Sequence, residues 1–199
     1  MTPEPADPSD PVPARPLRAD ARRNRERLLA VAEEVFAAKG TGASTEEIAR
    51  QAGVGIGTVF RHFPTKEALL AAVFLGRLER LGEQARALSA SAEPGPAFFG
   101  FFTLVVDQAS AKNAFAEALE QAGVDVEGVT SGVSGQLGAA LGELLRRAQA
   151  VGAVRDDLGV AELKALLVGA SRAVEFAGDP ETRARTLAVF LDGLRPTSG

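Results

Sequence analysis

The side chains best suited to chemistry are concentrated in one stretch of this 199-residue chain, residues 44–70. Its hydroxyl, guanidinium, imidazole and ammonium groups belong to Thr45, Thr58, Arg61, His62 and Lys66. Groups of these kinds donate hydrogen bonds to phosphate oxygens, and the fork of an arginine also fits the two acceptors on the major-groove edge of guanine. Their types and their spacing indicate binding to a nucleic acid rather than the breaking of a bond.

The composition leaves few routes to catalysis. The chain has no cysteine and only one histidine, so it offers no thiolate nucleophile, no zinc finger, no disulfide and no pair of imidazoles. No glycine-rich phosphate loop follows a strand. Carboxylates alone could still serve, although no pair is singled out, so an all-α enzyme acting on a hydrophobic small molecule stays as an alternative. We expect no enzyme activity, no cofactor and no metal.

A helix must begin at the start of this stretch. Ser44 precedes Glu47 by three residues, the spacing of a capping box, so a helix is predicted from about Thr45. Gly53 should end that helix, because glycine readily adopts the left-handed backbone that closes a helix. The polar groups beyond residue 55 would then follow directly after a tight turn.

A second short helix is predicted over residues 56–62. Val59 and Phe63 give it an apolar side at a spacing of four, Pro64 ends it, and a further helix should start at Lys66. Two short helices joined by a glycine-containing turn form a helix-turn-helix unit, whose second helix enters the major groove of DNA.

The run IARQAGVGIGTVFRHFPTKEALL, preceded by an arginine-rich segment that ends in FAAKG, resembles the DNA-binding domain of TetR-type transcriptional regulators. The match covers residues 21–72, and the rest of the chain matches only in length and helical layout. The residues that carry the resemblance, in order, are Phe36, Gly40, Thr45, Ile48, Ala49, Gly53, Val54, Thr58, His62, Phe63 and Lys66. It implies a sequence-specific regulator, a homodimeric repressor that a small effector releases from double-stranded operator DNA.

The resemblance also implies which residues meet the DNA. The predicted set is Thr45, Gly55, Ile56, Gly57, Thr58, Phe60, Arg61, His62 and Lys66. Three polar members have a plainer alternative: a helix cap without a ligand for Thr45, a solvated surface side chain for Arg61, and a packing role for His62.

Two positions depart from the family pattern. Phe60 stands where a tyrosine is common, and Gly55 with Ile56 replaces a pair that is often Ser-Lys-like. Both changes remove polar contacts from the second helix. Arginines at 18, 22, 23, 25 and 27 would compensate by gripping the DNA backbone or an adjacent minor groove.

The charge is divided unevenly along the chain. Residues 1–14 carry three acids, residues 15–66 carry ten Lys/Arg against six Asp/Glu, and residues 67–199 carry twelve against seventeen, within a total of −4. The basic charge therefore lies in the region that resembles a DNA-binding domain, where it can neutralise phosphates. A ligand-independent architectural DNA protein, a second alternative, would need basic charge over the whole body. A ligand-free dimeric scaffold is a weaker third.

The chain as a whole is predicted to be all-α, because alternating strand patterns are absent and Ala, Leu, Glu and Arg dominate. Residues 1–19, with six prolines, are predicted to be a disordered tail, residues 20–65 the helix-turn-helix domain, and residues 66–199 a six-helix ligand and dimerisation domain. Beyond the two short helices, helices are expected at 21–39, 66 to about 87, from about 96, about 112–122, about 133–150, about 160–176 and about 180–194, with a loop at 123–132.

The larger domain should have an aromatic interior. Four rings in FFGFF, at 98, 99, 101 and 102, point around much of a helix, so some must face a partner or a cavity besides the core. The resemblance implies an effector pocket, and the predicted lining is Phe74, Leu78, Phe98, Phe101, Phe102, Val105, Leu137 and Leu141. The pocket should be apolar, with Gln108, Asn113 or Gln136 as polar contacts or simply as surface residues.

The last two predicted helices are apolar on more than one side. Leu163, Leu167 and Val174 can serve the core of one subunit, while Val168 and Phe176 must look elsewhere, as Ala165 and Arg172 do. A homodimer through these two helices is therefore expected. No apolar run approaches the ~20 residues of a membrane span, and the proline- and acid-rich N-terminus is unlike a signal peptide, so we expect a cytoplasmic protein with no membrane partner.

Overall fold

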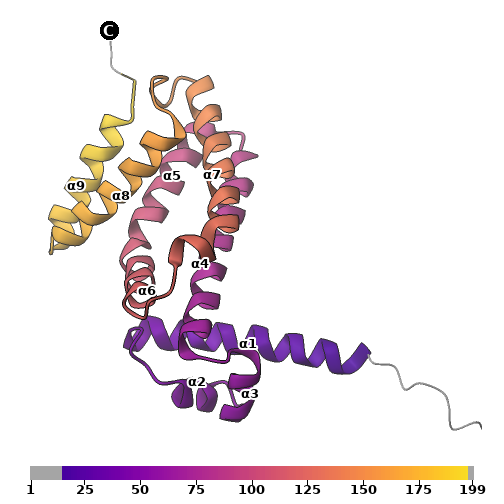
Figure 1. The fold of residues 1–199 in the computed structure, drawn as a ribbon. Coiled ribbons are helices and arrows are strands. Elements are labelled where there is room, and N and C mark those ends of the chain that lie inside the picture. Colours follow the sequence, from indigo (N-terminus) through magenta and orange to yellow (C-terminus); the bar gives the residue numbers. More distant parts are fainter. Residues whose placement is uncertain (1–14, 197–199) are drawn as a thin grey trace, which may run out of the picture.

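The computed structural model describes residues 15–196, with the side chains of 15–19, 110 and 111 left aside, and over that range it contains helices and turns without a strand. The all-α prediction is confirmed. The helices are α1 (Arg15–Lys39), α2 (Thr45–Gln51), α3 (Ile56–His62), α4 (Lys66–Ser89), α5 (Pro94–Asp107), α6 (Ala109–Gln121), α7 (Val126–Ala150), α8 (Val160–Phe176) and α9 (Pro180–Gly193) (Figure 1).

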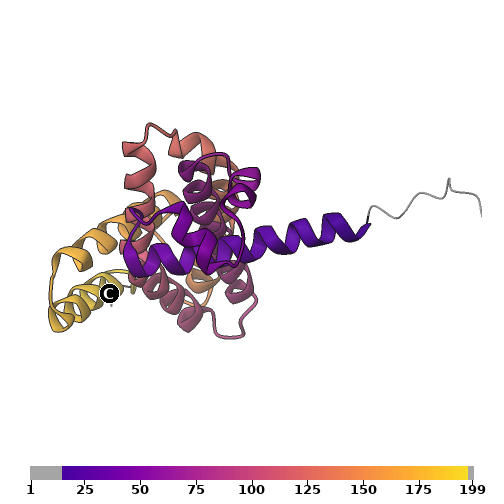
Figure 2. The same cartoon turned by 90° about the horizontal axis from the view of Figure 1, so that it is seen from below.

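Helices α1 to α3 form a small head at one end of the molecule, and α4 runs from this head to the opposite end (Figure 1). Helix α7 packs along α4, and α5 lies against both. Helix α8 lies between α5 and α9, so the last two helices form an outer pair. The N-terminal half of α1 projects away from the body in both views (Figures 1 and 2).

The start and the end of α2 follow from the residues that predicted them. Ser44 Oγ accepts a hydrogen bond from the Glu47 N–H at 3.2 Å, and Gly53 takes a left-handed φ of +65° after the helix ends. The Glu47 carboxylate does not complete the capping box. It pairs instead with Lys39 at the end of α1, and this hydrogen bond is the main cause that lowers the pKa of Glu47.

Two hydrophobic clusters make the core. One lies among α4, α5, α7 and α8, and includes Phe98 and Leu144. The other fills the head, yet it also contains Phe115 and Leu119 of α6 together with residues of α4 as far as Leu78. The interior of the head therefore extends past residue 65, into helices of the larger domain.

The predicted loop at 123–132 is wrong over most of its length, because α7 begins at Val126. Asp125 caps this start by accepting a hydrogen bond from the Gly128 N–H at 2.9 Å. The hydroxyl of Thr130 bonds to the Val126 carbonyl at 2.8 Å, so the polar residues here serve the helix backbone. The glycines of this segment suggested a loop, and the cap outweighs their low helix propensity.

The predicted disorder of residues 1–19 is wrong for 15–19, where α1 has already begun, while residues 1–14 lie outside the described part of the chain. Pro16 falls in the first turn of α1, where a missing N–H costs nothing. Helices α5 and α6 also begin earlier than predicted, at Pro94 and Ala109. Helices α3 and α8 have the predicted bounds.

Among the described helices, none combines the length and the apolar character that crossing a membrane requires.

Candidate DNA interface and ligand cavity

Helix α3 presents most of its predicted DNA contacts on its outer side. Ile56 and Phe60 are 37% and 43% exposed, and Gly57 and Arg61 are exposed beside them, while Val59 is 1% exposed and packs into the head. Residues 56, 57, 60 and 61 are spaced as neighbours on one side of a helix. This side therefore offers two apolar side chains and one guanidinium to whatever contacts the head.

The remaining predicted contacts flank that side. Thr58 and His62 are half-buried, as is Lys66 at the first turn of α4, and Gly55 is the exposed residue that precedes α3. Thr45 is only 8% exposed, so little of its side chain is available to a phosphate.

The arginines of α1 lie along its projecting half. Arg22 pairs with Glu26 at 3.6 Å and Arg23 with Asp20, both within α1, and the Arg25 guanidinium stands 5.1 Å from the centre of the Phe63 ring. These exposed pairs leave the guanidinium groups free to exchange a carboxylate partner for a phosphate, since surface pairs are weak. The side chain of Arg18 lies outside the described residues.

A cavity of about 340 Å³ lies among α4, α5, α6, α7 and α8. Its lining consists of Leu78, Leu81, Phe101, Val105, Lys112, Asn113, Ser134, Leu137, Leu141, Lys164, Leu167, Val168, Ser171 and Arg172. Five predicted lining residues are present: Leu78, Phe101, Val105, Leu137 and Leu141. Of the three polar residues considered, only Asn113 lines this cavity.

The other predicted lining residues lie in the hydrophobic cores. Phe74 belongs to the cluster of the head, and Phe98 and Phe102 belong to the cluster of the body. Phe98, Phe101, Phe102 and Val105 are spaced at i, i+3, i+4 and i+7, so all four lie on one side of α5. Of these four, only Phe101 and Val105 line the cavity.

Three cations at this cavity were not predicted. Lys112 comes from α6, and Lys164 and Arg172 come from α8. Burial, and then the nearby charge of Arg172, lower the pKa of Lys112. Arg172 is paired with Glu117 at 3.0 Å and with Glu175 at 3.2 Å. Positions 164, 168 and 172 are spaced four residues apart and so lie on one side of a helix. This spacing is the one feature of the sequence that could have placed Lys164 and Arg172 at the same site.

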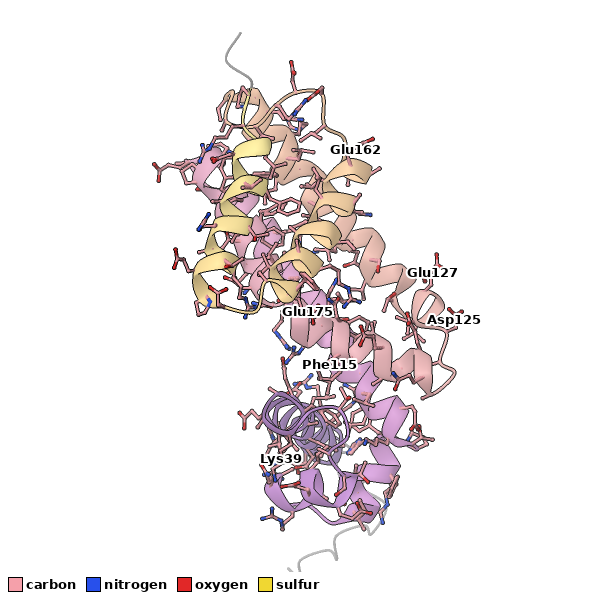
Figure 3. The ribbon with its side chains drawn as sticks, turned by 90° about the vertical axis from the view of Figure 1, so that its left-hand side faces the viewer. Lys39, Phe115, Asp125, Glu127, Glu162 and Glu175 are labelled. Atoms are coloured by element: carbon pink, nitrogen blue, oxygen red, sulfur yellow. The ribbon has the colours of Figure 1, made fainter. Side chains whose placement is uncertain are left out.

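Helix α6 joins the cavity to the head. One turn beyond Lys112, the Phe115 ring meets the Phe36 ring edge to face at 5.7 Å, and the Arg77 guanidinium lies 4.9 Å from its centre. Figure 3 shows Phe115 at this junction, between the head and the body.

An ion cluster of partly exposed side chains crosses the same junction. Glu33 of α1 bonds to Arg80 of α4 at 2.6 Å and lies 2.9 Å from Arg77 Nε, although that contact lacks hydrogen-bond geometry. The head, α4 and α6 are thus joined by aromatic and charged contacts.

Helices α8 and α9 each carry exposed apolar side chains. Val168, Phe176 and Val189 are 59%, 93% and 72% exposed, and α9 has no buried residue between Pro180 and Gly193. The side chains that were expected to face away from the core of the subunit are therefore exposed.

The comparisons with known proteins agree with this arrangement. Residues 28–73 match the family model described as bacterial regulatory proteins, tetR family, and residues 93–196 match the model described as transcriptional regulator SbtR-like, C-terminal domain. The regulator UidR of Escherichia coli is 29% identical over 196 residues, which cover 92% of this chain and 95% of that protein.

Two solved structures are similar over most of their length. A TetR transcription regulatory protein from Mycobacterium vanbaalenii is 46% identical with a TM-score of 0.74, covering 91% of this chain and 100% of its own. The regulator SCO0520 from Streptomyces coelicolor is 36% identical with a TM-score of 0.69, covering 87% and 99%. With a three-helix head, an all-helical body and these matches, the chain belongs to the TetR family of DNA-binding transcriptional regulators.

Proposed function

We propose that the chain is a homodimeric repressor, that α3 of each subunit reads one half of an inverted-repeat operator, and that a small, largely apolar ligand in the cavity releases the protein from DNA. The observation that carries the proposal is the shared position of α4 and α6, which line the cavity and also enter the core of the head.

The exposed side of α3 supports the proposal for the DNA contacts. Arg61 can span the two acceptors of a guanine, while Phe60 and Ile56 can contact thymine methyl groups. Lys66 at the start of α4 is suited to a phosphate, because a cation at a helix start opposes the helix dipole unless an anion lies opposite. Thr45 has a weaker claim, since its side chain is largely buried.

Two substitutions separate base reading from phosphate binding. Arg61→Ala should cost about 1–3 kcal/mol on the preferred operator and relax the preference at particular base pairs. Lys66→Ala should weaken binding to all sequences alike and lower the slope of log affinity against log salt by about one. Anisotropy titrations with the operator and its single-base variants measure both. If the two variants lose affinity uniformly across sequences, Arg61 contacts only phosphate.

The exposed side of α8 and α9 supports a dimer. A phenylalanine that is 93% exposed gains about 1.5–3 kcal/mol when it becomes buried, and Val189 would add to this. Two subunits related by a two-fold axis would make a four-helix interface, and the same symmetry would place two copies of α3 on successive turns of one face of the DNA.

The release step rests on linkage. A ligand that binds better when α4 or α6 is displaced must lower the operator affinity by the same factor, because the coupling free energy is reciprocal. Leu78 of α4 and Asn113 of α6 line the cavity, and Phe115 of α6 packs on Phe36 of the head. A small shift of either helix would therefore change the separation of the two α3 helices in the dimer.

A ligand screen followed by DNA titration tests the release. Hydrophobic compounds that raise the melting temperature are each titrated against the preformed operator complex. We expect the tightest binders to weaken operator binding about 5- to 150-fold, the usual range of allosteric coupling. Ligands that bind tightly in the cavity but leave the operator affinity unchanged would show that the cavity is not a switch.

The alternatives have less support. The family consists of transcriptional regulators, which favours a binding function over an enzyme acting on a hydrophobic molecule. Residues 67–199 carry more acids than bases, which disfavours an architectural DNA protein. A ligand-free scaffold does not account for the cavity. Because the target is genomic DNA, we place the protein in the bacterial cytoplasm.

A further inference from the structure

We infer that the cavity takes an apolar carboxylic acid: a molecule with a hydrocarbon body whose single carboxylate lies among Lys112, Lys164 and Arg172. This inference rests on the proposed ligand-binding function and specifies the chemical class of the ligand. A purely apolar effector, which the sequence predicted, would leave these cations without a counter-charge.

The charged side chains that line the cavity are all positive. Lys112, Lys164 and Arg172 contribute three positive groups, and the described residues that line the cavity include no aspartate or glutamate. Arg172 has carboxylate partners outside the lining, at Glu117 and Glu175. No such ion pair is found for Lys112 or Lys164 among the described side chains. Two ammonium groups therefore stand at the cavity without a carboxylate partner among the residues that the structure describes.

Of the three positive charges, that of Lys112 is the least well stabilised when no ligand is bound. Its side chain is half-buried, so the ammonium has lost part of its hydration, and the Arg172 guanidinium adds repulsion. A carboxylate bound between them would replace the lost hydration with charge-assisted hydrogen bonds and would screen the repulsion. A neutral ligand would do neither.

Lys164 reaches across the cavity from α8 to α7. Its Nζ lies 2.8 Å from the position that a Cβ would occupy at Gly138, so the ammonium packs against the backbone of α7 there. Lys164 as a whole is exposed. Its ammonium adds to the charges of Arg172 on the same helix and Lys112 on α6, which also line the cavity.

The other lining residues determine the size and the apolar character of the remainder of the ligand. Leu78, Phe101, Leu137 and Leu141 provide an apolar surface from three helices. A volume of about 340 Å³ is near the lower limit for small-molecule sites, which suits one or two rings or a medium-length chain. Asn113 and Ser134 can donate further hydrogen bonds.

Paired probes test the charge of the ligand. We would titrate 2-naphthoate and decanoate, and the neutral amide of each, into the full chain by calorimetry. The expected result is that at least one carboxylate binds roughly tenfold to a hundredfold more tightly than its amide, since a hydrogen bond to a charged group is worth about 1.5–3 kcal/mol. Equal affinities within each pair, or no binding of either acid at millimolar concentration, would overturn the inference.

Substitutions of the two lysines test whether the preference for a carboxylate arises at this cavity. Lys112→Met and Lys164→Met keep an apolar stem and should each reduce carboxylate affinity about tenfold, with little change for the amide, while Lys112→Arg should keep the preference. Arg146→Met, which removes an exposed cation of α7 outside the cavity, is the matched control and should change neither. A preference that survives in both lysine variants would place the acid elsewhere and overturn the inference. Circular dichroism confirms that each variant is folded.

The same titration repeated with operator DNA separates this inference from the proposed release. Preferential carboxylate binding that leaves operator affinity unchanged would uphold the ligand class and contradict the switch. Amides that bind as well as acids and release the operator would uphold the switch and contradict the ligand class.

Discussion

Replacing Phe176 by aspartate is expected to convert the dimer into monomers and to lower operator affinity by about two orders of magnitude. Phe176 is 93% exposed in the single subunit, at the end of α8 and beside the exposed side of α9. A buried aromatic anchor at the centre of an interface typically contributes 2 kcal/mol or more, and a carboxylate in its place must also be desolvated. A monomer would hold one half-site only and would lose the second set of contacts.

Sedimentation velocity at micromolar concentration measures the assembly, and anisotropy measures the operator affinity. Val151→Asp is the matched control, because Val151 is also an exposed apolar residue, 59% exposed, but lies just after α7 and outside α8 and α9. This variant should remain dimeric and bind normally. A Phe176→Asp protein that sediments as a dimer would contradict the proposed interface.

The second large effect is expected at the junction of the head and the body. Phe115→Ala should lower the free energy of unfolding by about 3–5 kcal/mol, because the ring is 2% exposed and its loss leaves a cavity. The change also removes the contact with Phe36 and the cation–π contact with Arg77. Chemical denaturation provides the measurement, and a loss below about 1 kcal/mol would show that the junction is loosely packed.

A milder pair of variants separates stability from coupling. Phe115→Leu and Phe98→Leu each reshape one fully buried ring, in the head cluster and in the body cluster respectively, and should cost similar amounts of stability. Only Phe115→Leu should reduce the factor by which a bound ligand weakens operator binding, since Phe98 has no contact with the head cluster. Equal reduction in both variants would show that coupling does not pass through α6.

The elements that the sequence predicted well are those specified by neighbouring residues. Ser44, Gly53 and Asp179 act within a single turn of chain, so the helix starts and stops at α2 and α9 could be read locally. The start of α7 was missed because Asp125 caps a helix whose first turns contain several glycines, and intrinsic propensity favoured a loop.

Of the two candidate sites, one could be predicted from neighbouring residues and the other could not. The exposed side of α3 follows from one short helix and one inward-facing residue, Val59, so its members could be predicted. The cavity requires α6 and α8 to meet, and Lys112 and Lys164 are 52 positions apart in the chain. Nothing in the local pattern of either lysine indicates the other, so their shared position could be found only from the fold.

The central claim, that this head reads DNA as a symmetric pair, is tested most directly by selecting bound fragments from a pool of random double-stranded DNA. The purified full chain is expected to enrich an inverted repeat whose half-site centres lie about 34–36 Å apart, or somewhat farther. The enrichment should be lost with Arg61→Ala at particular base pairs only. Enrichment of a single unrepeated site, or no enrichment above the starting pool, would contradict the account.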